Sequence, residues 1–456
     1  MNTHTRALTL LASLAFAAPA VGQSSSDGSA SASFELNESL DTAPNAFAGQ
    51  ERGPRTIEPD LQKSTPREWF GSTPWTQWTR VTGDWNGGRT WLDDRGFSIN
   101  GSYIVDYTSV LDGGIEKSGS FRQLVDLNAA WDLEKSLGWA GAKAFVDAQF
   151  SFMGGGSQDV GDFQGISSIA TGAKNIHQIS QLWLQQELLD DKIRLKAGKI
   201  DAGTEFNYVS HAGDFLNTAA INSINTAAAL PYYPQPATGI VAFLYPTEST
   251  YLCVGFFDGA TLDGIPTGPR GPRTFFSDDD SDSNFLIGEA GLNWESDSGT
   301  GRAAVGAWHH TADLPEFSGG TSSGNTGFFA LIEQQAWRRG QTDELKDKGL
   351  FAFVHGGVSD DEVTAAAVSI AAGLVLKGTF DSRLDDNAGL LIAFAGFSDA
   401  AGSPFTDDEI AVEVYYKIQL TPAISLTPDL QYIMNPSGVS TVDDAIVAGL
   451  RAAITF

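Results

Sequence analysis

The alternation of apolar and polar residues is the feature that most restricts the fold of this 456-residue chain. From Gly96 onward, apolar side chains recur at every second position, in stretches separated by Gly, Asp, Asn, Ser and Pro. A period of two indicates β-strands, because successive side chains of a strand point to opposite faces. The stretches have the length of tilted membrane-crossing strands, roughly 9–11 residues. The chain is therefore predicted to be all-β.

About sixteen such stretches can be counted, an even number of the kind that single-chain bacterial barrels have. In the first, Ile99 and Tyr103 share one face and Asn100 and Asp106 share the other. The same alternation is expected to run as far as Leu133 in the second. Sixteen to eighteen strands leave an aqueous lumen in a closed barrel. The stretches begin near Phe97, Phe121, Gly141, Gln178, Lys192, Thr238, Thr250, Phe285, Arg302, Gly327, Gly349, Thr364, Asn387, Glu409, Ile424 and Ala445.

Alternating strands have two structural explanations. In a soluble sandwich the apolar face packs inward, whereas in an outer-membrane barrel it faces lipid and the polar face lines the lumen. The polar faces here carry charges of both signs, which favours a lumen. Aromatic residues near the stretch ends resemble the girdles at membrane interfaces; they are Tyr103, Tyr107, Phe150, Phe152, Trp294 and Tyr416. We therefore expect a transmembrane antiparallel β-barrel of about 16 strands with an aqueous lumen.

The last stretch ends on an aromatic residue. Ile446, Leu450 and Phe456 lie on one face, and Arg451 lies on the other. A terminal aromatic that closes an alternating strand resembles the recognition signal of bacterial outer-membrane barrels. In a soluble protein, such an apolar edge strand would favour aggregation. Phe456 is therefore expected to contact the barrel assembly machinery.

The N-terminal region has the features of an export signal. Residues 1–6 carry one arginine, residues 7–18 are apolar, and Ala20 and Gly22 supply small residues before an expected cleavage site after Gly22. Residues 1–22 are predicted to be a signal peptide, 23–80 a flexible periplasmic extension, and 81–456 the barrel. Trp69, Trp75 and Trp78 in the extension suggest an interfacial or mouth-packing element. The rest of the chain lacks an apolar run long enough for a transmembrane helix.

Composition excludes some functional classes. The formal net charge of −28 argues against binding to nucleic acid, which requires a basic surface. Cys253 is the only cysteine, so no intramolecular disulfide can form. The acidic tract Asp278–Asp282 is interpreted as a solvated loop, with calcium binding as an alternative.

No motif for a catalytic site, a cofactor or a metal is found. The sequence lacks a Walker-type loop, His-Glu-x-x-His and a cysteine pair. His309 and His310 are adjacent, so on a strand they should point to opposite faces. We therefore expect no enzymatic activity, no cofactor and no bound metal.

Four segments, in order, resemble one known family. They are VTGDWNGGRTWLDDRGF at 81–97, LWLQQ at 182–186 with RLKAGK at 194–199, the segment 325–338 that ends in QQAWR, and TPAISLTPDLQYIMNP at 421–436. Together they resemble the carbohydrate-selective porin (OprB) family. The resemblance implies a sixteen-stranded barrel and uptake of sugars across the outer membrane. Residues 270–273 and 278–282 look like loop insertions of this chain, which leaves the preferred solute open.

Parity along the strands predicts which side chains line the lumen. If Leu182, Leu184 and Leu188 face lipid, the residues between them face inward. Among these, a tryptophan on a polar face is the hardest to explain by packing alone, so Trp183 is the strongest candidate for contact with a solute. The candidate solute-contacting residues are Trp183, Gln181, Gln185, Glu187, Arg194, Lys196, Arg122, Asp126, Glu289 and Glu333. Further inward-facing candidates are Asn128, Glu413, Lys417, Asp429, Gln431 and Arg451. For each of them, solvation of the channel is the alternative role.

The predicted function is passive diffusion of small hydrophilic solutes, mono- or oligosaccharides, through a porin in the outer membrane. The expected partners are sugars and outer-membrane lipid, and the family resemblance leaves both a monomer and a homotrimer open. An outer-membrane β-barrel hydrolase is one alternative, and it would need Ser, His and an acid or amide near one rim. A secreted polysaccharide-binding β-protein is another, and it would be recovered without detergent.

Overall fold

The computed structural model describes residues 68–172, 175–276, 281–296 and 298–456. The predicted signal peptide, residues 23–67 of the predicted extension, and Asp278–Asp280 of the acidic tract lie outside the described residues.

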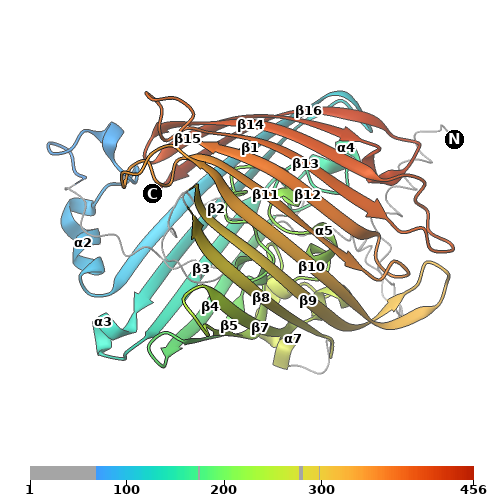
Figure 1. Ribbon diagram of the computed structural model, residues 1–456, viewed down its shortest axis with the longest axis horizontal. Helices are drawn as coiled ribbons and strands as arrows, with labels where there is room; N and C mark the ends of the chain where they lie inside the picture. Colours follow the sequence, from blue (N-terminus) through green and yellow to red (C-terminus); the bar gives the residue numbers. More distant parts are fainter. Residues whose placement is uncertain (1–67, 173–174, 277–280, 297) are drawn as a thin grey trace.

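The described residues form sixteen strands in one closed antiparallel barrel (Figure 1). Each strand pairs with its neighbours in the chain, and β1 pairs with β16 to close the sheet. Fifteen strands begin within three residues of their predicted starts, and β10 begins six residues before its own, so the predicted fold class is confirmed. The strands are β1 Phe97–Gly114, β2 Gly119–Asp132, β3 Ala142–Phe152, β4 Ile176–Leu188, β5 Ile193–Ile200, β6 Ala237–Leu244, β7 Thr250–Asp258, β8 Asn284–Ser296, β9 Gly299–Pro315, β10 Thr321–Arg338, β11 Gly349–Ser359, β12 Ala366–Lys377, β13 Asn387–Phe397, β14 Glu409–Thr421, β15 Ile424–Met434 and β16 Asp443–Thr455.

Short helices lie in the connections at both ends of the barrel. They are η1 Trp75–Gln77, η2 Trp85–Gly87, α2 Gly88–Asp93, α3 Leu133–Leu137, α4 Ser157–Val160, η3 Ala202–Thr204, η4 Thr218–Ala220, α5 Ile224–Ala227, η5 Ala260–Asp263, α6 Thr267–Arg270, α7 Arg273–Phe276 and η6 Pro436–Gly438. None of these described helices has the length and hydropathy that a membrane crossing would require. The expectation that Leu133 continues the second strand is wrong, because Asp132 caps the N-terminus of α3 and Leu133 starts that helix, where its side chain is buried.

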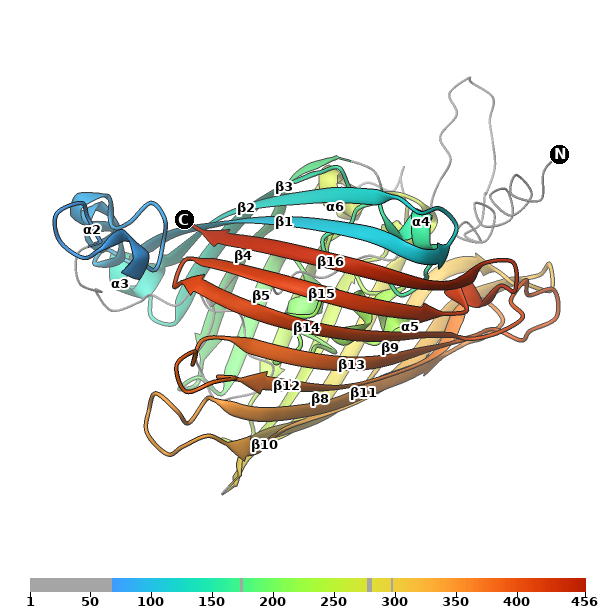
Figure 2. The same ribbon diagram turned by 90° about the horizontal axis from the view of Figure 1, so that it is seen from above.

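The two ends of the barrel differ. Figure 2 shows α2, α3 and the C-terminus at one end, called here the terminal end, and α4 at the other, called here the loop end. At the terminal end, only Pro422 and Ala423 separate β14 from β15. The connections at the loop end include the longest, residues 153–175, 201–236 and 259–283. Short turns at one end and long loops at the other are typical of outer-membrane barrels.

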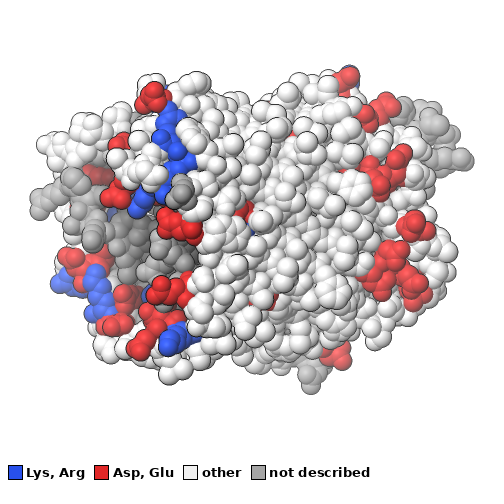
Figure 3. All heavy atoms as spheres, in the orientation of Figure 1, with Lys and Arg blue, Asp and Glu red and all other residues white. Residues whose placement is uncertain are grey.

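The outer surface of the barrel is apolar. Outward-facing residues such as Leu182, Val254 and Val305 are exposed, while their neighbours along each strand are less exposed and point inward. On the face that Figure 3 shows, charged residues gather toward the two ends, and the wide band between them is almost free of charge. Such a band is the surface that a membrane barrel presents to lipid, and a soluble sandwich would bury it.

Aromatic residues border this band. Near the terminal end, the rings of Phe97 and Trp131 stack with centroids 5.0 Å apart. Near the loop end, Tyr107 and Phe121 lie 4.7 Å apart. Aromatic side chains favour the level of the lipid headgroups, because their rings are amphipathic.

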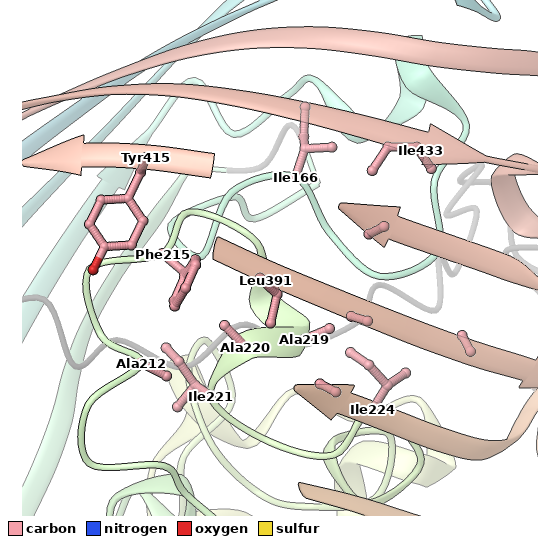
Figure 4. Close-up of a cluster of buried hydrophobic side chains, with 14 of the residues drawn as sticks. Ile166, Ala212, Phe215, Ala219, Ala220, Ile221, Ile224, Leu391, Tyr415 and Ile433 are labelled. Atoms are coloured by element: carbon pink, nitrogen blue, oxygen red, sulfur yellow. The ribbon is translucent and has the colours of Figure 1, made fainter. Parts of the chain in front are cut away.

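Two of the long connections fold into the barrel. We call residues 157–172 the first inserted segment and residues 201–236 the second. Figure 4 shows Ile166, Phe215 and Ile221 of these segments beside Leu391 and Tyr415, which point inward from β13 and β14. These side chains belong to one buried apolar cluster, so both inserted segments pack against the wall. The segments also bond to each other, because Ser168 N donates to the Leu216 carbonyl at 2.7 Å.

Candidate functional site

The ten candidate residues all lie on the inward side of the wall, where they alternate with exposed, lipid-facing residues. Their surroundings divide them into two groups. Five of them, Arg122, Arg194, Lys196, Glu289 and Glu333, are buried against the inserted segments. The other five lie on β2 and β4: Trp183 and Gln185 are buried, while Asp126, Gln181 and Glu187 are half-buried.

Glu205 of the second inserted segment binds the wall at β5. Its carboxylate lies 2.7 Å from Arg194 Nη2 and forms a second ion pair with Lys196 Nζ. All three side chains are at most 5 % exposed. An ion pair this deeply buried is costly to break, because a charge without its partner would remain desolvated.

The next part of the second inserted segment is bound to β8 and β10. Asn207 N donates to Glu289 Oε2 at 2.8 Å, and Ser210 N donates to Glu333 Oε2 at 2.9 Å. Arg302 pairs with Glu333 at 3.0 Å and donates to the Tyr208 carbonyl. The two predicted lumen glutamates therefore act as acceptors for backbone amides of this segment.

The first inserted segment is bound through Arg122 and Asp106. Arg122 donates to Thr108 Oγ1 at 2.8 Å and to the carbonyl of Gly155, just before the segment. Ser167 Oγ donates to Asp106 Oδ2 at 2.7 Å, and Arg451 forms two bonds of 2.8 Å with the same carboxylate.

Trp183 has neighbours on its ring that the sequence did not reveal. It stacks on Phe145 with centroids 5.0 Å apart, and Lys196 Nζ lies 4.0 Å from its ring centroid. Its Nε1 donates to Gln181 Oε1 at 3.3 Å. Only 6 % of the side chain stays exposed. Contact between this ring and a solute remains a prediction.

The wall of β2–β4 keeps polar side chains that are half-buried. Lys143 and Glu187 form an ion pair at 3.5 Å with about a quarter of each side chain exposed. Asp126 accepts from Asn128 and from Gln149, each at 3.1 Å. Together with Gln181, these side chains provide donors and acceptors to water inside the barrel.

One edge of the second inserted segment, residues 210–214, is partly exposed: Ser210 is exposed, residues 211, 213 and 214 are half-buried, and Ala212 is buried. Lys417 Nζ lies 2.6 Å from Asp214 Oδ1, and Asn387 Nδ2 donates to Asp214 Oδ2 at 2.8 Å. Burial acts to raise the pKa of Asp214, but Lys417, Asn387 and Lys377 together lower the pKa below its usual value. This edge therefore places a carboxylate between two lysines.

His211 belongs to the same edge. Its Nδ1 lies 3.1 Å from Lys377 Nζ, and its ring lies 4.1 Å from the ring of Phe351. Parity along β14 identified Lys417, but nothing in the sequence pointed to His211 or Asp214. Both lie in an irregular segment, where apolar and polar residues do not alternate and parity therefore predicts nothing.

Asp201 joins the two ends of the second inserted segment, and its titration should make stability depend on pH. Its carboxylate accepts from Gly203 N at 2.9 Å and from Tyr233 N at 3.1 Å. Burial raises its pKa from 3.8 to about 7. The fold thus favours the protonated form, and this stabilisation is present below pH 4 and is lost as the pH rises through 7.

We expect Asp201→Asn to remove this part of the pH dependence, because asparagine does not titrate and keeps one of the two acceptor oxygens. Thermal unfolding in detergent at pH 5, 7 and 9 measures the effect. The midpoint of the wild type should fall more steeply between pH 5 and 9 than that of the variant. Equal slopes would contradict the predicted role of Asp201.

The histidines show no catalytic arrangement within the described residues. His309 is exposed and His310 buried, so the two point to opposite faces. Ser223 Oγ lies 3.2 Å from His355 Nδ1, but the other ring nitrogen lies 3.1 Å from the Ala220 carbonyl and the pair is buried. No group of three or more His, Cys, Asp or Glu able to hold a metal occurs in the described part of the chain.

Comparisons with known proteins agree with this architecture. The family model described as "Carbohydrate-selective porin, OprB family" matches residues 116–456, which include three of the four resembling segments. "Porin B" of Pseudomonas aeruginosa is 27 % identical over 84 % of this chain and 92 % of its own length. "Putative porin QuiX" of Acinetobacter baylyi is 26 % identical over 83 % of this chain and 93 % of its own length.

Among solved structures, that of Pseudomonas putida OprB at high pH superposes with a TM-score of 0.74 at 22 % identity. The superposed region covers 83 % of this chain and 99 % of the Pseudomonas putida chain. At this identity, the likeness supports the fold.

Proposed function

The chain belongs to the carbohydrate-selective porin family, OprB, and we propose that, as a porin of the bacterial outer membrane, it passes mono- and oligosaccharides by passive diffusion. The observation that carries this function is the contrast between the two sides of the wall. The outside presents an apolar band, while the inside carries charged and amide side chains. Polar groups of this kind replace water around a solute without holding it tightly.

We propose that solutes pass between two polar surfaces. One is the wall of β2–β4 with Asp126, Lys143, Gln181 and Glu187, and the other is the partly exposed edge 210–214 of the second inserted segment. The four wall residues are half-buried and the edge is open at residues 210, 211, 213 and 214, whereas nearly all the rest of the second inserted segment is buried. Arg122, Arg194, Lys196, Glu289 and Glu333 would then act mainly by positioning the inserted segments.

The orientation follows from the lengths of the connections. Since outer-membrane barrels have short periplasmic turns, we propose that the terminal end faces the periplasm and the apolar band contacts outer-membrane lipid. Phe456 pairs with Gly101 through two backbone bonds, of 2.8 and 2.9 Å. We propose that the barrel assembly machinery recognises this strand. Light scattering in detergent would decide between a monomer and a homotrimer.

A planar-bilayer recording with the detergent-purified protein tests the function. Stable ohmic current steps that added sugars block are the expected result. Absence of any conductance would overturn the porin function. We propose that the chain catalyses no reaction, since the Ser223–His355 pair is buried and the second ring nitrogen of His355 faces the Ala220 carbonyl instead of an acid.

We expect Trp183→Ala to weaken the block by sugars several-fold while the barrel still folds. The ring contacts Lys196 and Gln181 beside the wall of β2–β4. It also stacks on Phe145, and an aromatic pair of this kind contributes about 0.5–1.5 kcal/mol. The measurement is the blocking constant in the bilayer. Trp337→Ala, at an exposed tryptophan of β10, is the control and should leave the block unchanged. An unchanged block in Trp183→Ala would show that this side chain does not shape the passage.

A further inference from the structure

Both inserted segments are bound to one small part of the wall, which we call the β14–β15 anchor and define as Glu409, Glu413 and Gln431. Glu413 accepts from the backbone amides of residues 216 and 217, at 2.6 and 2.9 Å. Glu409 accepts from the amides of residues 163 and 164, at 2.7 and 2.9 Å. Each carboxylate thus binds two consecutive amides, one pair in each inserted segment.

Gln431 joins the two attachments. It lies opposite Glu413 in the register of β14 and β15. Its Nε2 donates to the Ile166 carbonyl at 2.9 Å, and its Oε1 accepts from Asn217 Nδ2 at 3.1 Å. All three side chains of the anchor are fully buried. The anchor therefore binds both segments at the place where they also bond to each other.

The bonds of the anchor determine where the inserted segments lie. The segments are irregular, so these amides have no strand partner, and a buried amide without an acceptor is costly. A glutamate on a rigid strand supplies two acceptor oxygens, one for each of two consecutive amides. We propose that Glu409, Glu413 and Gln431 are positioning residues that set the width of the solute passage by fixing both inserted segments against the wall. This role rests on the porin function proposed above.

Loss of the anchor has a definite direction. The wall lies behind the segments, so a released segment can move only toward the centre of the barrel. Glu205 and Glu333 would still hold the earlier part of the second inserted segment, so its later part would move most. The passage should become narrower and fluctuate.

Glu413→Gln and Glu413→Asp in the full-length protein test this role. Aspartate keeps the charge but is one methylene shorter, so it cannot reach both amides. Single-channel recordings should show a conductance at least twofold lower and a noisier open state for both variants, while heat-modifiable migration on gels shows an intact barrel. Glu295→Gln is the matched control on β8, since its side chain is exposed and lies 3.3 Å from Arg338. The conductance of this variant should equal that of the wild type.

Other outcomes would overturn the inference. Unchanged conductance in both variants would do so. A shift of ion selectivity in Glu413→Gln, with Glu413→Asp equal to wild type, would instead assign Glu413 the role of a lumen charge. If neither variant folds, Gln431→Met can be tested instead, because it leaves both glutamates in place. It should show the same lower conductance. Conductance equal to that of the wild type would refute the positioning role. Absence of conductance in the wild type would overturn the porin function itself.

Discussion

Glu205→Ala should destabilise the barrel by about 3–5 kcal/mol, because it leaves Arg194 and Lys196 buried without their partner. Removing one member of a buried ion pair costs more than the pair contributes, since the remaining charges stay desolvated. The measurement is the free energy of unfolding in urea, followed by tryptophan fluorescence in detergent. The second inserted segment should also loosen from β5.

Two further variants isolate this effect. Asp112→Ala breaks an exposed ion pair with Lys117 on the surface and should cause no measurable change. The triple variant Arg194→Met, Lys196→Met and Glu205→Leu replaces the charges with apolar side chains, and we expect it to recover most of the lost stability. If Glu205→Ala unfolds like the wild type, the buried triad is absent in the folded protein.

Val254→Arg should impair insertion strongly, because this side chain is 60 % exposed at the centre of β7 within the apolar band. An arginine at the bilayer midplane of a β-barrel costs about 2–4 kcal/mol, and about 0–1 kcal/mol near the interface. Folding into lipid vesicles, followed by heat-modifiable migration, measures the effect.

The control places the same residue at the barrel end. Leu189→Arg changes an exposed leucine between β4 and β5, outside the strands, and should fold nearly as well as the wild type. Equal folding of Val254→Arg and Leu189→Arg would indicate that the band does not lie in lipid.

The sequence predicted the barrel well because each strand carries its own signal. Lipid on one side and water on the other impose a period of two on every strand, and this period is visible without knowledge of the partners. The inward orientation of Arg194 and Glu289 followed from the same parity. The family match over residues 116–456 confirmed the resemblance to the carbohydrate-selective porins.

The occupants of the lumen could not be predicted in the same way. The inserted segments are irregular, and their amides bind side chains of distant strands, as Asn207 does with Glu289 and Leu216 with Glu413. Neither contact produces a pattern in the nearby sequence from which it could be predicted. Parity identifies which side of the wall a residue occupies, but not whether it meets solute or a buried loop. For Arg194 and Lys196, the partner is Glu205, which lies outside any alternating stretch.

The most direct measurement is the accessibility of spin labels on the two sides of the wall, in vesicles and in a Cys253→Ala background. Labels would be placed by Leu430→Cys, an exposed outward position on β15, and by Asp126→Cys, an inward position on β2. We expect collisions with oxygen to dominate at position 430, and collisions with a water-soluble nickel chelate to dominate at position 126. Equal access of the chelate to both positions would show that the apolar face meets water, and that the wall does not separate lipid from a wet interior.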